Sequence, residues 1–118
     1  MDNARARALL CAERDEVRDL LKDAETAVRE DRKSETVDGP KDTGDLAQPL
    51  GAEGVDEVIA GTLRDRLDAI ERALRRLDEG TYGRSVRSGK LIPDQRLEAD
   101  PAAELTVEEA RRIEEARH

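Results

Sequence analysis

The sequence predicts a mainly α-helical protein built on an antiparallel coiled-coil hairpin, and three observations favour that fold class. Of the 118 residues, 36% are hydrophobic and 42% are charged, which leaves too little apolar surface for a thick globular core. One Tyr and no Trp or Phe are present, so the core must consist of aliphatic side chains. The apolar residues recur at helical spacing in two long stretches. We therefore expect amphipathic helices that meet along a thin seam.

The first helix is expected from Ala4 to about Lys33, a stretch that contains no Gly or Pro. Its apolar face consists of Leu10, Val17, Leu21, Ala24 and Val28. The single cysteine, Cys11, cannot form an internal disulfide, and its neighbours favour an ordinary seam residue over a redox or nucleophilic thiol. Residues 34–54 are dense in turn-forming types and are expected to form the tip loop of the hairpin.

The second helix gives the clearest pattern in the sequence, because its apolar residues step by three or four without a miss until Gly80. These residues are Val55, Ile59, Leu63, Leu67, Ile70, Leu74 and Leu77. Some 25 residues of helix, at about 1.5 Å each, predict an arm of roughly 35 to 40 Å. The oppositely charged pair Asp68 and Arg72 is expected on the solvated outer surface. Residues 1–79 therefore form the hairpin, and residues 80–118 form a separate C-terminal module.

The charge distribution excludes several functions. A net charge of −8 disfavours direct binding to nucleic acid or to an anionic membrane, whose affinities depend on Lys and Arg. The first 60 residues hold 16 acidic and 9 basic side chains, against 13 and 12 in the remainder, which favours a basic protein partner for the first half. The apolar stretch Ala8 to Ala12 is too short for a signal core or membrane span, so a cytoplasmic location is expected.

A short series of motifs follows the second helix. It consists of Gly80-Thr81-Tyr82-Gly83, Gly89, Ile92-Pro93 and Arg96-Leu97-Glu98-Ala99, preceded by Ile70-Glu71-Arg72-Ala73-Leu74. Ser88-Gly89 is expected to form a tight turn with positive φ at Gly89, and a final helix is expected from about Thr106. Over about residues 55 to 112, this order closely resembles the C-terminal zinc-finger module of the DksA/TraR family.

The resemblance implies four positions for a structural zinc ion, which two Cys-x-x-Cys pairs bind in that family. These positions are Ser85, Ser88, Thr106 and Glu109, and none is a cysteine. Because zinc prefers thiolate or imidazole ligands, neither zinc nor any other cofactor is expected, and the terminal His118 does not restore a site. The sequence from Thr106 to Glu109 has the form of a capping box, which could start the last helix where metal ligation starts it in relatives. Sequence drift after loss of zinc is the alternative.

The resemblance also implies a function. In that family, relatives that regulate transcription have a long helical hairpin. Its tip carries an Asp-x-x-Asp-x-Ala pattern and enters the secondary channel of RNA polymerase. Here that pattern is carried by Asp42, Asp45 and Ala47. A divergent, zinc-less regulator of transcription initiation is therefore expected, with cooperation by guanosine tetraphosphate undetermined. The tip could also be an ordinary acidic loop.

Two other classes of function, a scaffold protein and an enzyme, are the alternatives. One alternative is a helical interaction or scaffold protein that keeps the family fold without polymerase regulation. An enzyme is disfavoured, because the sequence has no phosphate-binding glycine loop and no Ser/His/Asp or Cys/His set.

Overall fold

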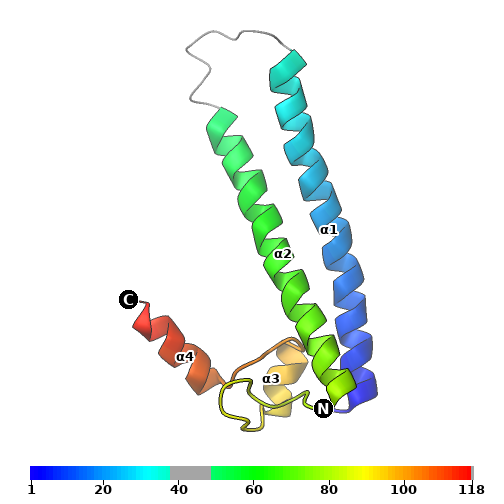
Figure 1. Ribbon diagram of the computed structural model, residues 1–118, viewed down its shortest axis with the longest axis vertical. Helices are drawn as coiled ribbons and strands as arrows, with labels where there is room; N and C mark the ends of the chain where they lie inside the picture. Colours follow the sequence, from blue (N-terminus) through cyan, green and yellow to red (C-terminus); the bar gives the residue numbers. More distant parts are fainter. Residues whose placement is uncertain (38–48, 118) are drawn as a thin grey trace. The chain divides into compact units, whose positions relative to one another are not determined.

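The computed structural model describes the backbone of residues 1–37 and 49–117 and the side chains of residues 1–30 and 55–117. The described backbone contains α1 (Asn3–Val37), α2 (Pro49–Glu79), α3 (Asp94–Ala99) and α4 (Val107–Ala116), shown in Figure 1. The expectation of a mainly helical fold is confirmed. No helix in the described part of the chain is long and apolar enough to cross a bilayer.

Helical structure reaches further into the turn-rich segment than the sequence predicted. α1 continues to Val37 and α2 already begins at Pro49, so the expected loop boundaries at residues 34 and 54 are wrong. The first boundary moves because residues 34–37 contain no Gly or Pro to end the helix. The second moves because proline is well tolerated in the first turn of a helix, where its missing N–H needs no acceptor.

The chain divides into two compact units, and both long helices contribute to each. The base unit comprises Met1–Arg14 and Asp68–His118, and the arm unit comprises Asp15–Leu67. In the base unit, the seam between α1 and α2 is closed. Its buried residues are Ala6 and Leu10 of α1 and Ile70, Ala73 and Leu77 of α2. These small and aliphatic side chains let the two helices pack closely without aromatic residues.

The seam of the arm unit is only partly closed. Val17 and Ala60 are buried, but Val55 is 58% exposed and Ile59 is 46% exposed. The prediction that these last two residues face the partner helix is therefore wrong. Helical periodicity identifies an apolar face, but it does not establish that the facing helix supplies apolar partners along its whole length.

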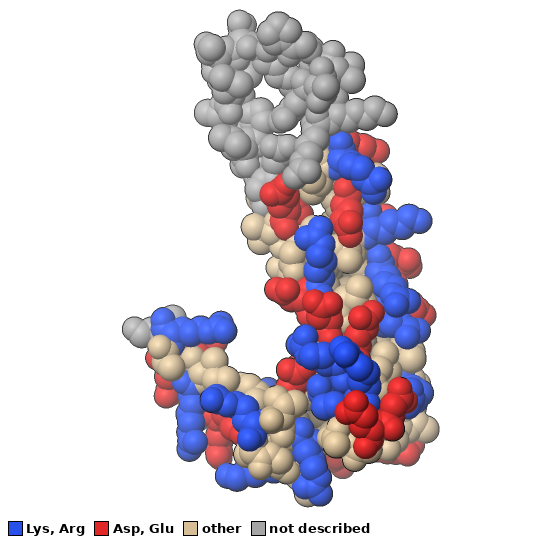
Figure 2. All heavy atoms as spheres, in the orientation of Figure 1, with Lys and Arg blue, Asp and Glu red and all other residues tan. Residues whose placement is uncertain are grey.

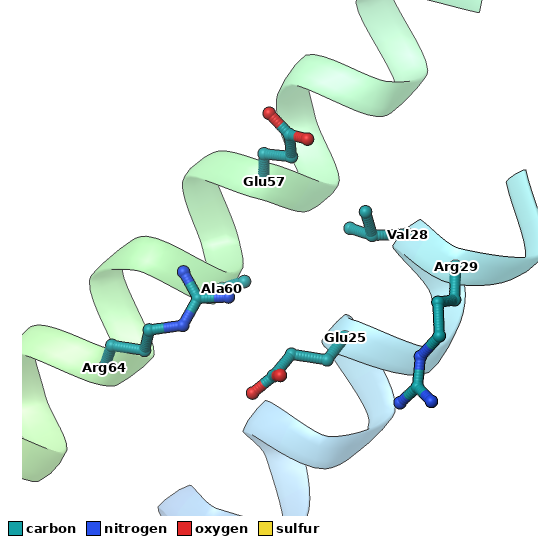
Figure 3. A pocket seen from close by; sticks show the side chains of 6 residues that line it. All are labelled: Glu25, Val28, Arg29, Glu57, Ala60 and Arg64. Carbon is teal, nitrogen blue, oxygen red and sulfur yellow. The ribbon is translucent and has the colours of Figure 1, made fainter. Parts of the chain in front are cut away.

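A pocket of about 460 Å³ lies between the helices of the arm unit. Its lining consists of Glu25, Val28 and Arg29 of α1 with Glu57, Ala60 and Arg64 of α2. In Figure 3, the side chains of Glu25 and Arg64 reach into the space between the helices. Charged side chains keep contact with water, and Ala60 is too small to fill the gap. The seam therefore stays open at this level.

α2 ends as the sequence predicts. Gly80 has a φ of 80°, and its N–H points to the carbonyl oxygen of Leu77 at 3.4 Å. The N–H of Thr81 donates to the carbonyl oxygen of Arg76 at 2.9 Å. These two interactions form a Schellman motif, in which glycine adopts the left-handed conformation without steric cost. The chain then leaves the helix axis and enters the module.

The module has its own small apolar cluster, formed by Ile92, Leu97 and Ala103 with Met1 and Tyr82 packed against it. Leu97 lies on α3, a short helix that the sequence analysis did not predict and that follows directly after Pro93. The family motif residue Tyr82 donates its hydroxyl to the carbonyl oxygen of Pro101 at 2.8 Å. Burial raises the pKa of that hydroxyl, which keeps it protonated as a donor.

A matched pair of substitutions tests whether the seam is closed in one unit and open in the other. Ile70→Ala should lower the free energy of unfolding by about 2 to 5 kcal/mol, because it leaves a cavity at a fully buried site. Ile59→Ala makes the same chemical change at an exposed site and should cost no more than roughly 0.5 kcal/mol. Urea unfolding followed by circular dichroism measures both. Equal losses would contradict the open seam.

Candidate functional site

The first two family zinc positions lie in a tight turn of the base unit. The N–H of Ser85 donates to the carbonyl oxygen of Lys90 at 2.8 Å, and the N–H of Gly89 donates to that of Ser85 at 3.0 Å. Arg84 and Leu91 form an isolated antiparallel bridge across the base of the turn. Gly89 has a φ of 75°, which confirms the predicted turn.

Ser85 is buried, with 4% of its surface exposed. Its Oγ accepts the backbone N–H groups of Arg87 at 3.1 Å and Ser88 at 3.3 Å. The oxygen is therefore already engaged as an acceptor, and its own proton is left to donate. The serine side chain at this position closes the turn by accepting backbone N–H groups of the same turn.

The other two positions form the start of α4. Glu109 donates its N–H to Thr106 Oγ1 at 3.2 Å, while Thr106 donates its N–H to Glu109 Oε1 at 2.9 Å. This reciprocal pair confirms the predicted capping box, and α4 begins at Val107 as a result. The box satisfies two backbone donors that the first turn of a helix otherwise leaves without partners.

The Glu109 carboxylate brings all four positions together. Hydrogen bonds from the Ser85 hydroxyl, the Thr106 backbone N–H and the Ser88 hydroxyl lower the pKa of Glu109 to about 2. We call Ser85, Ser88, Thr106 and Glu109 the polar cluster. Through it the turn of residues 84–91 is joined to the N-terminal end of α4. The capping box was predictable from the sequence, whereas the serine contacts were not.

The polar cluster does not fit a zinc ion. Three of its four side chains are neutral hydroxyls, and Ser85 Oγ already accepts two N–H groups. Among the residues that the structure describes, no group of three or more His, Cys, Asp or Glu side chains is placed to hold a metal ion. The terminal His118 lies outside the described residues. The chemistry that this arrangement supports is hydrogen bonding between two segments.

Arginine contacts hold the module against the long helices within the base unit. Arg5 of α1 donates two hydrogen bonds to the Glu98 carboxylate, at 2.9 and 2.8 Å, and they lower the pKa of Glu98. Arg72 and Arg76 of α2 both donate to Glu104 Oε1, at 2.6 and 3.2 Å. Arg72 thus contacts the module rather than only solvent, which the sequence did not predict because Glu104 lies 32 residues further along the chain.

The expected tip residues, Asp42, Asp45 and Ala47, lie outside the described residues. Their role in binding therefore stays a prediction.

The first test at this site concerns metal. Because the polar cluster does not fit zinc, purified protein should contain no stoichiometric zinc, and its helical circular dichroism should survive a strong chelator. Elemental analysis and chelator titration measure the two properties. Stoichiometric zinc together with unfolding on chelation would contradict this expectation.

The second test concerns pH. The pKa of Glu109 is about 2 in the folded chain against a reference value of 4.5. The ionised carboxylate therefore stabilises the fold above pH 4.5, and this contribution disappears as the pH falls towards 2. Glu109→Gln should lower the melting temperature at pH 7 and reduce its loss between pH 4.5 and 2. Glu108→Gln, at the exposed neighbouring position, is the control, and identical profiles for both variants would refute the role of Glu109.

Known proteins resemble this chain in sequence and in fold. The chain matches no protein-family model. It is 38% identical to general stress protein 16O of Bacillus subtilis over 60 residues, which cover 51% of the chain and 37% of that relative. It is also 38% identical to the RNA polymerase-binding transcription factor DksA of Caulobacter vibrioides over 74 residues, 59% of the chain and 51% of the relative. The chain thus matches about half or less of the length of these curated relatives.

The fold gives a broader match. The solved structure of transcription factor DksA2 from Pseudomonas aeruginosa aligns with a TM-score of 0.78 and 27% identity, covering 98% of this chain and 86% of that one. The likeness therefore includes the long helices as well as the module. Sequence and fold thus agree in their similarity to DksA proteins.

Proposed function

We propose that this protein binds RNA polymerase and modulates transcription initiation by inserting the tip of its hairpin into the secondary channel of the enzyme. The observation that carries the proposal is the fold match to transcription factor DksA2 over 98% of the chain. The identity with an RNA polymerase-binding factor from Caulobacter vibrioides supports the same partner. In this function the protein is a regulator and not an enzyme.

The helices supply the length that insertion requires. α1 has 35 residues and α2 has 31, and at about 1.5 Å per residue they span roughly 45 to 55 Å. Residues 38–48 connect these helices in the sequence and contain the tip motif. A hairpin of two helices is slim, because a single helix with its side chains is only about 10 to 12 Å across. Such a hairpin suits a narrow channel.

The proposed action of the tip is electrostatic and steric. Asp42 and Asp45 would accept hydrogen bonds from basic or N–H groups in the channel, and Ala47 adds little bulk. The acidic excess of the first 60 residues would steer the hairpin towards a basic entrance. No covalent step and no bound metal ion are needed for this mechanism.

The base unit would act as the support of the hairpin. The closed seam around Ile70 fixes α1 against α2, and the arginine contacts at Glu98 and Glu104 fix the module against both helices. These contacts make the base a single compact body.

Substitution of the tip carboxylates tests the proposed function. The double variant Asp42→Asn, Asp45→Asn removes two charges from the segment between α1 and α2 and should keep its helical circular dichroism. It should lose most of the effect that the wild type has on promoter-complex lifetime with the RNA polymerase of its own organism. Glu114→Gln, Glu115→Gln removes the same charge from exposed positions of α4 and should regulate as the wild type does.

Two outcomes would contradict the proposal. If the tip variant regulates as strongly as the wild type, the tip is not the working end of the hairpin. If the wild type neither co-purifies with core RNA polymerase nor alters promoter complexes, the protein is better described as a scaffold that keeps the family fold.

A further inference from the structure

The turn formed by residues 84–91, here called the basic turn, is a local reversal of charge in an acidic protein. It carries Arg84, Arg87 and Lys90, and no acidic residue occurs from Gly80 to Pro93. The chain as a whole has a net charge of −8. Figure 2 shows Lys and Arg side chains projecting from the lower rim of the module. A positive surface in such a chain needs a physical explanation.

Two of the three cations of the basic turn, Arg87 and Lys90, form no ion pair within the described part of the fold. Both side chains are exposed. The neighbouring carboxylates already have partners, because Glu104 binds two arginines of α2 and Glu109 binds the serines of the turn. Arg84 differs, since it donates to the carbonyl oxygen of Gly89 at 3.1 Å.

Exposed apolar side chains lie within the same turn. Val86 is 55% exposed and Leu91 is 69% exposed. Either residue alone would be unremarkable on a protein surface. Together with the cations they form a mixed surface of apolar and basic groups, whereas neighbouring Ile92 is buried in the module core. That composition is typical of a protein–protein contact with a charged rim.

The basic turn also has a fixed backbone. Ser85 Oγ accepts two N–H groups within the turn, and the bridge between Arg84 and Leu91 closes its base. The N–H of Ile92 donates to the carbonyl oxygen of Gly83 at 2.8 Å. A preorganised turn loses little conformational entropy on binding, so its few side chains can contribute efficiently to affinity.

We infer that the basic turn is a second contact surface for RNA polymerase, and that it docks against an acidic surface of the enzyme with an apolar centre. This inference rests on the proposed function and extends it beyond the hairpin tip. Nucleic acid is a poorer partner, because phosphate binding gains affinity from many cations and the chain is acidic overall. Two contacts of opposite charge would fix the orientation of the regulator on the enzyme.

The test compares two double variants that remove the same charge from exposed positions. Arg87→Ala, Lys90→Ala alters the basic turn, and Arg111→Ala, Arg112→Ala alters α4. Binding of the full chain to core RNA polymerase is measured by association and dissociation kinetics at several salt concentrations. The turn variant should bind roughly ten-fold more weakly, mainly through slower association, with a weaker dependence on salt. The α4 control should stay within roughly two-fold of the wild type.

A third variant addresses the apolar part of the surface. Val86→Ser should leave the melting curve unchanged, because the side chain is exposed, and should speed dissociation from the polymerase. An unchanged dissociation rate would show that only the charged side chains contribute to the contact, and it would overturn the inferred apolar centre.

Each remaining outcome is decisive. Wild-type affinity in the turn variant, or an equal loss in the α4 control, would overturn this inference and leave the proposed function in place. Failure of the wild type to bind polymerase would overturn both. Binding of random-sequence duplex DNA that depends on Arg87 and Lys90 would replace the protein surface with nucleic acid. A dimer detected by sedimentation and lost in the turn variant would replace it with a second copy of the chain.

Discussion

In the C-terminal module, one carboxylate links two segments of the chain through hydrogen bonds. Glu109 receives the hydroxyls of Ser85 and Ser88 and the N–H of Thr106, so it joins a tight turn to the first residues of α4. A module of this size cannot bury enough apolar surface to fix both segments by packing alone. Its apolar cluster is correspondingly small. Polar contacts must therefore determine where the turn ends and where the last helix begins.

This arrangement distributes the holding interactions instead of concentrating them. A structural zinc ion supplies on the order of 10 kcal/mol in small metal-binding peptides, far more than any single hydrogen bond contributes. Here the polar cluster, the arginine contacts to Glu98 and Glu104 and the hydroxyl of Tyr82 act on the same module. Because the arginine pairs are partly exposed, salt screens them, and each is individually weak.

Local signals in the sequence predicted local structure well. Gly80 ends α2, Gly89 adopts positive φ, and the capping box starts α4, because each of these depends on residues only a few positions apart. Contacts across long separations in sequence were not predictable, as in the pair of Arg72 with Glu104. Of the candidate site, the capping box was predicted, but the serine contacts to Glu109 were not. The helical spacing of the apolar residues correctly predicted α2. The burial of Val55 and Ile59, which the same pattern predicted, was wrong, because both side chains are exposed.

The charged pocket between α1 and α2 in the arm unit has a consequence for motion. Backbone amides exchange with solvent through local openings, whose free energy depends on how many buried contacts must break. Around Glu25 and Arg64 few apolar contacts cross the seam, whereas around Ile70 the side chains are fully buried. Amide hydrogens near the pocket are therefore expected to exchange through small, frequent openings, and those near Ile70 only through cooperative unfolding. A single pair of helices thus contains two levels of protection along its length.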